Sequence, residues 1–185
     1  YCADKDGVFF TKKMSADTRN RFMDYLESHK LAGIMETADR YVYTEINDRV
    51  RTVMNRELPP AENCRELAED VYQMIAFVNA DEQAGLMAQM HDCTAFRWSD
   101  GAVDLTLKTG GKRAGITAVL EKYGIDRADT MAFGDGGNDT DMLEFVGTGI
   151  AMGNAADAAK AAADYITDDV EHNGIFNALK HFGVI

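Results

Sequence analysis

The sequence predicts an α/β protein built from two parts. Its 185 residues are 46% hydrophobic and 27% charged, which is typical of a folded globular chain with one large domain or two small ones. After about residue 100, short apolar runs typical of strands alternate with runs of helical periodicity. This alternation predicts right-handed βαβ units on a parallel sheet, so the second half should be an α/β fold with a parallel, Rossmann-like sheet.

The first hundred residues predict a separate α/β domain that begins with a hairpin. Asp6-Gly7 lies between two apolar runs, and an Asp-Gly pair favours a tight turn because glycine accepts a positive φ. Ser15 is the expected cap of a helix that starts at Ala16, and Gly33 breaks that helical pattern. We further expect strands over 41–43, 71–78 and 94–98, a helix over 45–55, and a helix from Asn79 to about Met90 with Glu82 completing a capping box.

The turn Ser99-Asp100-Gly101 marks the expected boundary between the domains, near residue 100. The second part should then contain strands over 103–107, 130–133, 149–152 and 165–167, and helices between Gly111 and Gly124, through Met142-Leu143, over the alanine-rich segment and over 175–182.

Charge and residue usage exclude several classes of function. The chain carries 19 Lys and Arg against 31 Asp and Glu, and its net charge of -12 disfavours nucleic acid as a partner. No apolar stretch reaches the ~20 residues of a membrane helix. The three cysteines suit neither a disulfide framework nor a CxxC site, so we expect a cytoplasmic protein. The four histidines show no spacing suited to zinc.

An acidic glycine loop is the most informative stretch. Gly134-Asp135-Gly136-Gly137-Asn138-Asp139 follows a predicted strand and precedes a helix, the place where α/β sheets gather ligands. Asp135 and Asp139 offer two carboxylates that suit a divalent cation, and magnesium is the natural candidate. A surface turn remains the alternative, since Gly, Asn and Asp are common turn formers.

Lys112 is the second candidate, behind Gly110-Gly111 at a predicted helix start. An ammonium group beside free backbone N–H groups suits an anion such as phosphate, although a solvated surface lysine explains it equally well. In Met152-Gly153-Asn154-Ala155 we expect only helix capping by Asn154.

Several segments in a fixed order carry a family resemblance. As a set they resemble the C-terminal half of haloacid dehalogenase (HAD) superfamily phosphatases, most closely the Cof-like branch, strongly over 103–185. The first hundred residues resemble the cap of this branch by size and pattern. Hence 101–185 are expected to be the C-terminal part of a HAD-like core and 1–100 an α/β cap that sets substrate specificity. The segments are Gly111-Lys112, Phe133-Gly134-Asp135-Gly136-Gly137-Asn138-Asp139 with Met142-Leu143, Gly149-Ile150-Ala151-Met152-Gly153-Asn154-Ala155, and Asn173-Gly174-Ile175.

The resemblance implies a magnesium-dependent phosphatase that acts on a small phosphorylated metabolite through an aspartyl-phosphate. Carried over, Lys112 would be catalytic and steady the nucleophile and the transferring phosphate. Asn138 would lie near that phosphate. Asp135 would bind magnesium, and Asp139 would be a catalytic residue that binds the metal or orients a metal-bound water.

The start of the chain departs from the family pattern, which opens with an apolar strand ending in Asp-x-Asp-Gly-Thr. Asp4-Lys5-Asp6-Gly7 imitates that motif, but Val8 replaces Thr and no full strand precedes it, so a hairpin turn is favoured. The sequence therefore predicts a fragment that lacks the nucleophile and is inactive alone. Such a fragment would expose apolar edges such as 131–133 and associate with the missing N-terminal segment or with itself.

Two other functions remain open from sequence. A non-catalytic binding module could use the same scaffold without a nucleophile. A phosphoacceptor signalling domain ranks lower, because its acceptor should end an internal strand and Asp135 is the only strand-terminal acid. The substrate is not specified, and core or surface roles are favoured for the candidate cap contacts Arg40, Tyr41, Tyr43 and Trp98.

Overall fold

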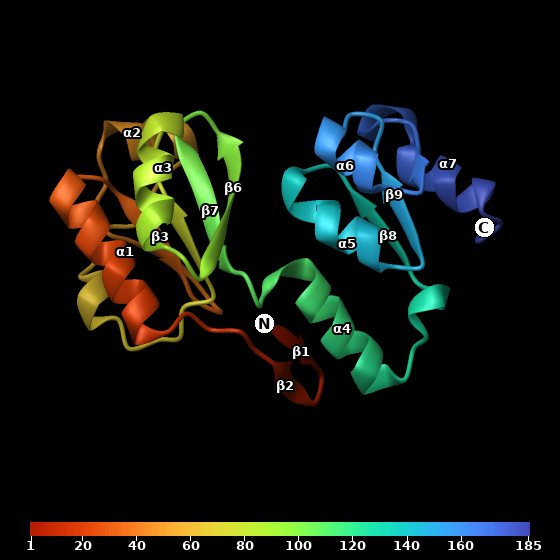
Figure 1. Ribbon diagram of the computed structural model, residues 1–185, viewed down its shortest axis with the longest axis horizontal. Helices are drawn as coiled ribbons and strands as arrows, with labels where there is room; N and C mark the ends of the chain where they lie inside the picture. The colour runs from red at the N-terminus through yellow and green to blue at the C-terminus, as the bar shows by residue number, and fades with distance from the viewer. The chain divides into compact units, whose positions relative to one another are not determined.

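The computed structural model describes residues 1–185 and divides the chain into two compact units (Figure 1). The first comprises Tyr1 and Ala3–Gly110, and the second comprises Cys2 and Gly111–Ile185. The elements before Gly110 are β1 (Cys2–Asp4), β2 (Gly7–Phe10), α1 (Ala16–His29), β3 (Gly33–Glu36), β4 (Tyr41–Tyr43), α2 (Asp48–Met54), η1 (Cys64–Glu66), β5 (Gln73–Ala76), α3 (Ala80–Gln89), β6 (Cys93–Ser99) and β7 (Ala102–Leu107).

The boundary between the units lies at Gly110-Gly111 and not near residue 100. Strand β7 pairs antiparallel with β6 across the turn at residues 99–101, and also with β5. A hairpin turn keeps both of its strands in one sheet, so the turn that suggested a boundary instead joins two strands of the first unit.

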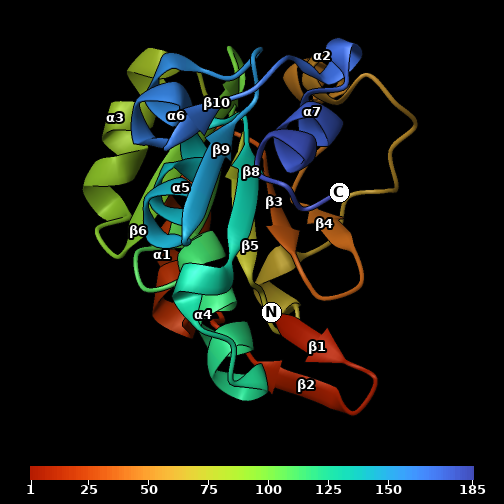
Figure 2. The same cartoon turned by 90° about the vertical axis from the view of Figure 1, so that its right-hand side faces the viewer.

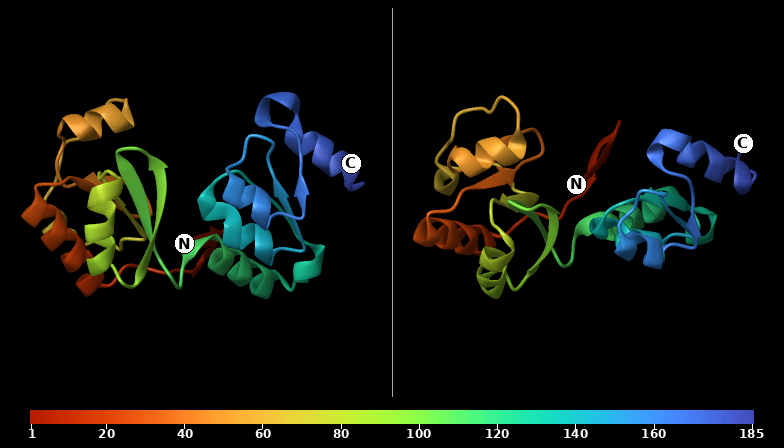
Figure 3. Two further views of the ribbon diagram at one scale, coloured as in Figure 1. Left: turned by 45° about the horizontal axis from the view of Figure 1, so that its top comes forward. Right: turned by 90° about the horizontal axis from the view of Figure 1, so that it is seen from above.

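The first unit is built on a five-stranded antiparallel sheet in the order β4-β3-β5-β7-β6. Helices α1 and α3 lie on one side of this sheet and α2 on the other (Figure 3). Each face has its own buried apolar cluster, one containing Phe22, Met35 and Leu105, the other containing Ile34 and Phe77. The two faces follow from strand alternation, because successive side chains point to opposite sides.

The helix caps predicted for this unit are confirmed. The Ser15 hydroxyl accepts a hydrogen bond from the Thr18 amide at 3.0 Å. Asn79 and Glu82 form the expected capping box, with reciprocal hydrogen bonds of 2.9 and 2.8 Å. The hairpin at Asp6-Gly7 also forms, with Gly7 at a φ of +118°.

Strand β3 was not predicted, because Gly33 reads as a helix breaker. In the structure Gly33 begins this central strand where α1 crosses closely. A Cβ at Gly33 would lie 2.7 Å from Leu26 Cδ1 and 2.9 Å from the Ile75 carbonyl oxygen. A glycine is therefore needed here because the helix packs closely on the sheet, and it does not mark a loop.

The second unit carries a three-stranded parallel sheet in the order β10-β9-β8, which confirms the predicted α/β class. Figure 2 shows α5 and α6 on one side of this sheet and α7 on the other. Its elements are α4 (Gly111–Tyr123), η2 (Arg127–Asp129), β8 (Met131–Gly134), η3 (Gly137–Asp139), α5 (Thr140–Phe145), β9 (Thr148–Ala151), α6 (Asp157–Ala162), β10 (Tyr165–Ile166), η4 (Val170–His172) and α7 (Gly174–His181).

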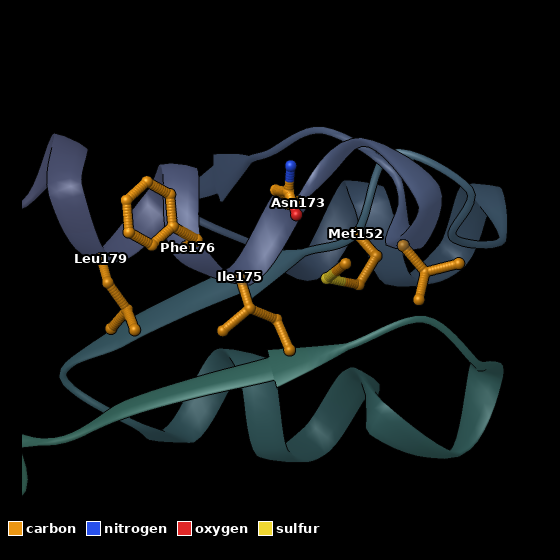
Figure 4. Close-up of a pocket in the computed structure, with 7 residues that line it drawn as sticks. Met152, Asn173, Ile175, Phe176 and Leu179 are labelled. Atoms are coloured by element: carbon orange, nitrogen blue, oxygen red, sulfur yellow. The ribbon is translucent and has the colours of Figure 1, made fainter.

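Apolar exposure in the second unit is largest beside α7. The edge-strand residues 131–133 are half-buried, whereas Ile175 and Phe176 are 50% and 55% exposed. Together with Met152, Val170 and Leu179 they line a groove of about 360 Å³ (Figure 4). The expected apolar surface is thus present, mainly on α7 and η4 instead of on the edge strand β8. None of the helices is long and apolar enough to cross a membrane.

Candidate functional site

The acidic loop leaves the carboxyl end of β8 and folds back on itself. Gly134, the last residue of the strand, is required for this path, because a Cβ there would lie 2.6 Å from the Cβ of Asp139. The chain then forms η3 and enters α5. This geometry brings the Asp139 side chain under the start of its own loop.

Asp139 holds the loop closed from inside. It is only 3% exposed. Its Oδ2 accepts hydrogen bonds from the backbone amides of Asp135 at 2.9 Å and Gly136 at 3.0 Å. Its Oδ1 accepts a hydrogen bond from the Lys112 ammonium and forms an ion pair with it. Both carboxylate oxygens are therefore engaged by donors from this unit.

The surroundings of Asp139 keep its carboxylate charged. Burial by itself raises the pKa of this group, since a desolvated carboxylate favours its neutral form. The Lys112 ammonium and the amides of Gly136 and Asp135 act in the opposite direction and prevail, so the pKa lies below its usual value. The loop thus contains a buried negative charge at neutral pH.

Lys112 reaches the loop from another element. It is the second residue of α4, whose first residue, Gly111, has a φ of +82°. Its side chain is 47% exposed, so the ammonium contacts Asp139 and also faces solvent. The first turn of α4 adds backbone N–H groups at the positive end of the helix. The arrangement can attract an anion close to Asp139.

Asp135 and Asn138 occupy the outer part of the loop. The Asp135 side chain is exposed and forms no hydrogen bond or ion pair within the chain, while its backbone oxygen accepts a hydrogen bond from the Ala156 amide at 2.8 Å. Asn138 is half-buried. The structure therefore joins Lys112 and Asp139 directly and leaves the Asp135 carboxylate available to a ligand.

Asn154 does not cap a helix, contrary to the sequence prediction. Helix α6 starts at Asp157 with Ala156 at the capping position. The Asn154 Oδ1 instead accepts a hydrogen bond from the Val170 amide at 3.1 Å, and so joins the loop after β9 to the start of η4. The pattern of strand, Gly-Asn and helix could not reveal this partner, which lies sixteen residues away in the chain.

Asp4 and Asp6 belong to the N-terminal turn. The Asp4 carboxylate accepts a hydrogen bond from the Asp6 amide at 2.9 Å, and Asp6 forms an exposed ion pair with Lys5. These contacts are those of an Asx-type turn, in which a side chain caps the backbone of a hairpin.

Comparison with known families decides the identity of the fold. The family model of haloacid dehalogenase-like hydrolases matches residues 1–179. The chain belongs to this family. The resemblance noted in the sequence and the predicted fold class, a HAD-like α/β core with a cap, are thereby confirmed.

Individual relatives agree with this assignment. YkrA of Bacillus subtilis is 35% identical over 132 residues, which are 71% of this chain and 51% of YkrA. The 5-amino-6-(5-phospho-D-ribitylamino)uracil phosphatase YitU of Bacillus subtilis is 29% identical over 190 residues, covering 97% of this chain and 70% of YitU. The chain thus spans about half the length of YkrA.

Solved structures show the same architecture. The HAD subclass IIB sugar phosphatase BT4131 matches with a TM-score of 0.91 and 29% identity, covering 100% of this chain and 73% of BT4131. The phosphatase BT1666 of Bacteroides thetaiotaomicron matches with a TM-score of 0.90 and 27% identity, covering 100% of this chain and 71% of BT1666. Both similarities include both units of the chain.

Proposed function

We propose that the protein is a magnesium-dependent phosphatase that removes the phosphoryl group from a small phosphorylated metabolite through an aspartyl-phosphate. The observation that carries the proposal is the Lys112–Asp139 pair at the carboxyl end of β8, beside the exposed Asp135 carboxylate. An ammonium, a buried carboxylate and an available carboxylate together suit phosphoryl transfer, in which positioning and charge stabilisation supply most of the catalysis.

The residues of the acidic loop fit a magnesium site in which Asp135 and Asp139 have different roles. Mg²⁺ is usually held by one or two carboxylates, its remaining ligands being waters and substrate phosphate. Asp135 suits direct coordination because its carboxylate has no partner in the chain. Both oxygens of Asp139 already accept N–H donors, which favours a role in shaping the site over direct coordination. No group of three or more acidic, histidine or cysteine side chains converges, so a protein-only cage is not the arrangement proposed. Bound magnesium would polarise the phosphate and offset its charge.

The other residues bind and orient the phosphate. Lys112 would donate hydrogen bonds from its ammonium to phosphate oxygens while Asp139 holds that ammonium in place. The amide of Asn138 is suited to donate a further hydrogen bond from the same loop. We assign no residue of this chain as the attacking carboxylate, because Asp4 and Asp6 are engaged in the hairpin turn.

We further propose that the first unit is the cap, the part that determines which metabolite is accepted. The proposal is supported by the likeness to BT4131 over the whole chain. Two similar proteins, a sugar phosphatase and a 5-amino-6-(5-phospho-D-ribitylamino)uracil phosphatase, are both named for small phosphorylated compounds. We therefore propose a substrate of that class.

The test combines metal binding with hydrolysis. Mn²⁺ is a paramagnetic substitute for Mg²⁺, and it should broaden the amide NMR signals of residues 134–139 in the wild type. Asp135→Asn should abolish the broadening, and in a form of the protein that includes the attacking aspartate it should lower magnesium-dependent hydrolysis of p-nitrophenyl phosphate by at least about a hundred-fold. Asp129→Asn, which removes an exposed carboxylate elsewhere in the same unit, is the matched control.

The outcomes separate the phosphatase from the non-catalytic binding module. Hydrolysis that requires Asp135 supports the phosphatase. Metal binding without hydrolysis by the form that includes the attacking aspartate favours the non-catalytic binding module, for which the engagement of Asp4 and Asp6 in a turn is the supporting observation. Broadening that survives Asp135→Asn would refute the assigned metal ligand.

A further inference from the structure

The main chain of Asp135 is hydrogen-bonded on both of its sides, while its side chain is exposed. The Asp135 amide donates a hydrogen bond to Asp139 Oδ2 at 2.9 Å. The Asp135 carbonyl oxygen accepts a hydrogen bond from the Ala156 amide at 2.8 Å. Because both peptide groups of this residue are engaged, two separate parts of the fold set the direction in which its side chain leaves the backbone. One part is the acidic loop itself, and the other is the loop that follows β9.

Residues 152–156 form this second support, and we call them the β9 loop. They connect β9 to α6 at the carboxyl end of the parallel sheet, beside the acidic loop that follows β8. At the start of the β9 loop, the Met152 amide donates a hydrogen bond to the Gly134 carbonyl oxygen at 3.0 Å. A tight turn follows, closed by the Ala155 amide and the Met152 carbonyl oxygen at 2.9 Å. The turn places the Ala156 amide against the acidic loop.

The β9 loop is in turn hydrogen-bonded to the segment that follows β10. The Gly153 amide donates a hydrogen bond to the Asp168 carbonyl oxygen at 3.1 Å, and the Asn154 Oδ1 accepts one from the Val170 amide at 3.1 Å. Gly153 lies so close to this segment that an added Cβ would be 2.7 Å from the Asp169 nitrogen. The exposed Asn154 side chain therefore acts through a hydrogen bond and not through burial in a core.

The start of η4 gives the Asn154 side chain a fixed partner. The Asp169 carboxylate caps this short helix and accepts hydrogen bonds from the amides of Glu171 and His172 at 3.0 and 2.9 Å. The first amides of a helix have no acceptor within the helix, and the Val170 amide is one of them. Asn154 supplies the acceptor that this amide needs, so the bond satisfies η4 and holds the β9 loop at the same time.

A magnesium ligand must be placed accurately, and Asp135 depends on its main chain for this. Mg²⁺ requires a nearly ideal octahedron with metal–oxygen distances of about 2.0–2.1 Å. The Asp135 carboxylate forms no hydrogen bond or ion pair that would orient it, so its placement follows from the backbone that carries it. Removal of groups that orient a metal ligand typically weakens metal binding by about ten- to a hundred-fold.

We propose that Asn154 is a positioning residue for the metal ligand Asp135. Its side chain holds the β9 loop against η4, and the Ala156 amide at the end of that loop holds the Asp135 main chain. Asn154 touches neither the metal nor the phosphate. This role rests on the proposed function, in which Asp135 binds magnesium, whereas the hydrogen bonds that support the loop belong to the metal-free chain.

Amide hydrogen exchange, followed by NMR, tests the support without any metal. In Asn154→Ala the Val170 amide loses its acceptor, so exchange at Val170 and Ala156 should quicken by about ten-fold or more. Asn154→Asp keeps an oxygen at the same place and should exchange like the wild type. The comparison is made at an ionic strength that screens the new carboxylate from those of Asp168 and Asp169.

Manganese binding tests the consequence for the site. Mn²⁺ replaces Mg²⁺, and the EPR signal of the free ion gives its affinity for the purified chain. Asn154→Ala should weaken Mn²⁺ binding by about ten-fold, and Asn154→Asp should restore it to within about two-fold of the wild type.

Asn47→Ala is the matched control for a general loss of stability. The Asn47 Oδ1 also accepts a hydrogen bond from a valine amide, that of Val50, at the same distance of 3.1 Å, but in the first unit. This variant should leave both the exchange at Ala156 and the affinity for Mn²⁺ unchanged.

Four results would overturn the positioning role. The first is a folded Asn154→Ala variant that matches Asn47→Ala in exchange at Ala156 and in Mn²⁺ affinity. The second is an Asn154→Asp variant that behaves like Asn154→Ala, because the acceptor oxygen would then not be what holds the loop. The third is faster exchange with unchanged Mn²⁺ affinity, which would make Asn154 a purely structural contact. The fourth is a wild type that binds no Mn²⁺, which would refute the proposed metal site as well and is distinguished from the others by that fact.

Discussion

Replacement of Asp139 separates two contributions to the loop that it closes. Asp139→Asn keeps the shape and an oxygen for the amides of Asp135 and Gly136, but removes the charge that pairs with Lys112. Because the lysine side chain is 47% exposed, solvent screens the pair, and we expect a loss of only about 1 kcal/mol. Asp139→Ala also leaves two amides without their acceptor, which should raise the loss to about 3 kcal/mol.

The charge contribution depends on pH in a defined direction. The folded-state pKa of Asp139 is lower than in the unfolded chain, so the carboxylate stabilises the fold at pH above its unfolded value of about 4. As pH falls through the folded-state pKa, both states become protonated and the stabilisation is lost. The difference between wild type and Asp139→Asn should therefore be full at neutral pH and shrink below about pH 4.

Urea unfolding and amide hydrogen exchange measure the two effects. Circular dichroism gives the free energy of unfolding, and exchange at residues 135 and 136 reports the loop directly. Exchange there should quicken by about a hundred-fold in Asp139→Ala, since each 1.4 kcal/mol is a factor of ten. Glu144→Gln, an exposed acid on α5, is the control. The reasoning is refuted if both Asp139 variants match this control in stability and exchange.

Further predictions concern packing, thiol chemistry and capping. Gly149→Ala should lower the free energy of unfolding by at least about 2 kcal/mol in urea titrations, because the added Cβ would lie 2.2 Å from the Leu143 carbonyl oxygen; a neutral effect would contradict the backbone contact. Only Cys2, which is partly exposed, should react quickly with Ellman's reagent in the native protein, because burial raises the pKa of Cys64 to about 11 and of Cys93 to about 12; three fast thiols before denaturation would disprove this. Asn79→Ala should cost about 1 kcal/mol in thermal unfolding by removing the capping box of α3, and an unchanged melting temperature would show that α3 does not need the cap.

Local sequence signals predicted most elements of the fold. Ser15 and Asn79 mark helix starts through hydrogen bonds that span three residues, and Asp6-Gly7 marks a turn through the φ of a single glycine. Such signals depend on neighbours in the chain and can be identified without a tertiary structure. Strand β3 was missed because Gly33 is required by packing against Leu26, a contact that local propensity does not contain.

The candidate site was predicted in its members but not in its contacts. Lys112, Asp135, Asn138 and Asp139 were all identified from the order of motifs. The direct pairing of Lys112 with Asp139 joins residues 27 positions apart and appears only when α4 meets the loop after β8. The same holds for Asn154, whose partner Val170 begins η4, beyond two further elements of the chain.

The sequence by itself determined the α/β class, the parallel strands of the second unit and the loop that carries the carboxylates, because hydrophobic period and turn chemistry are local properties. Only the tertiary structure decided that β7 belongs to the first unit, that both oxygens of Asp139 are already engaged, and that the Ala156 amide holds the main chain of Asp135. Sheet order and register place residues that are distant in sequence side by side, and no local pattern encodes which strand becomes the neighbour of which.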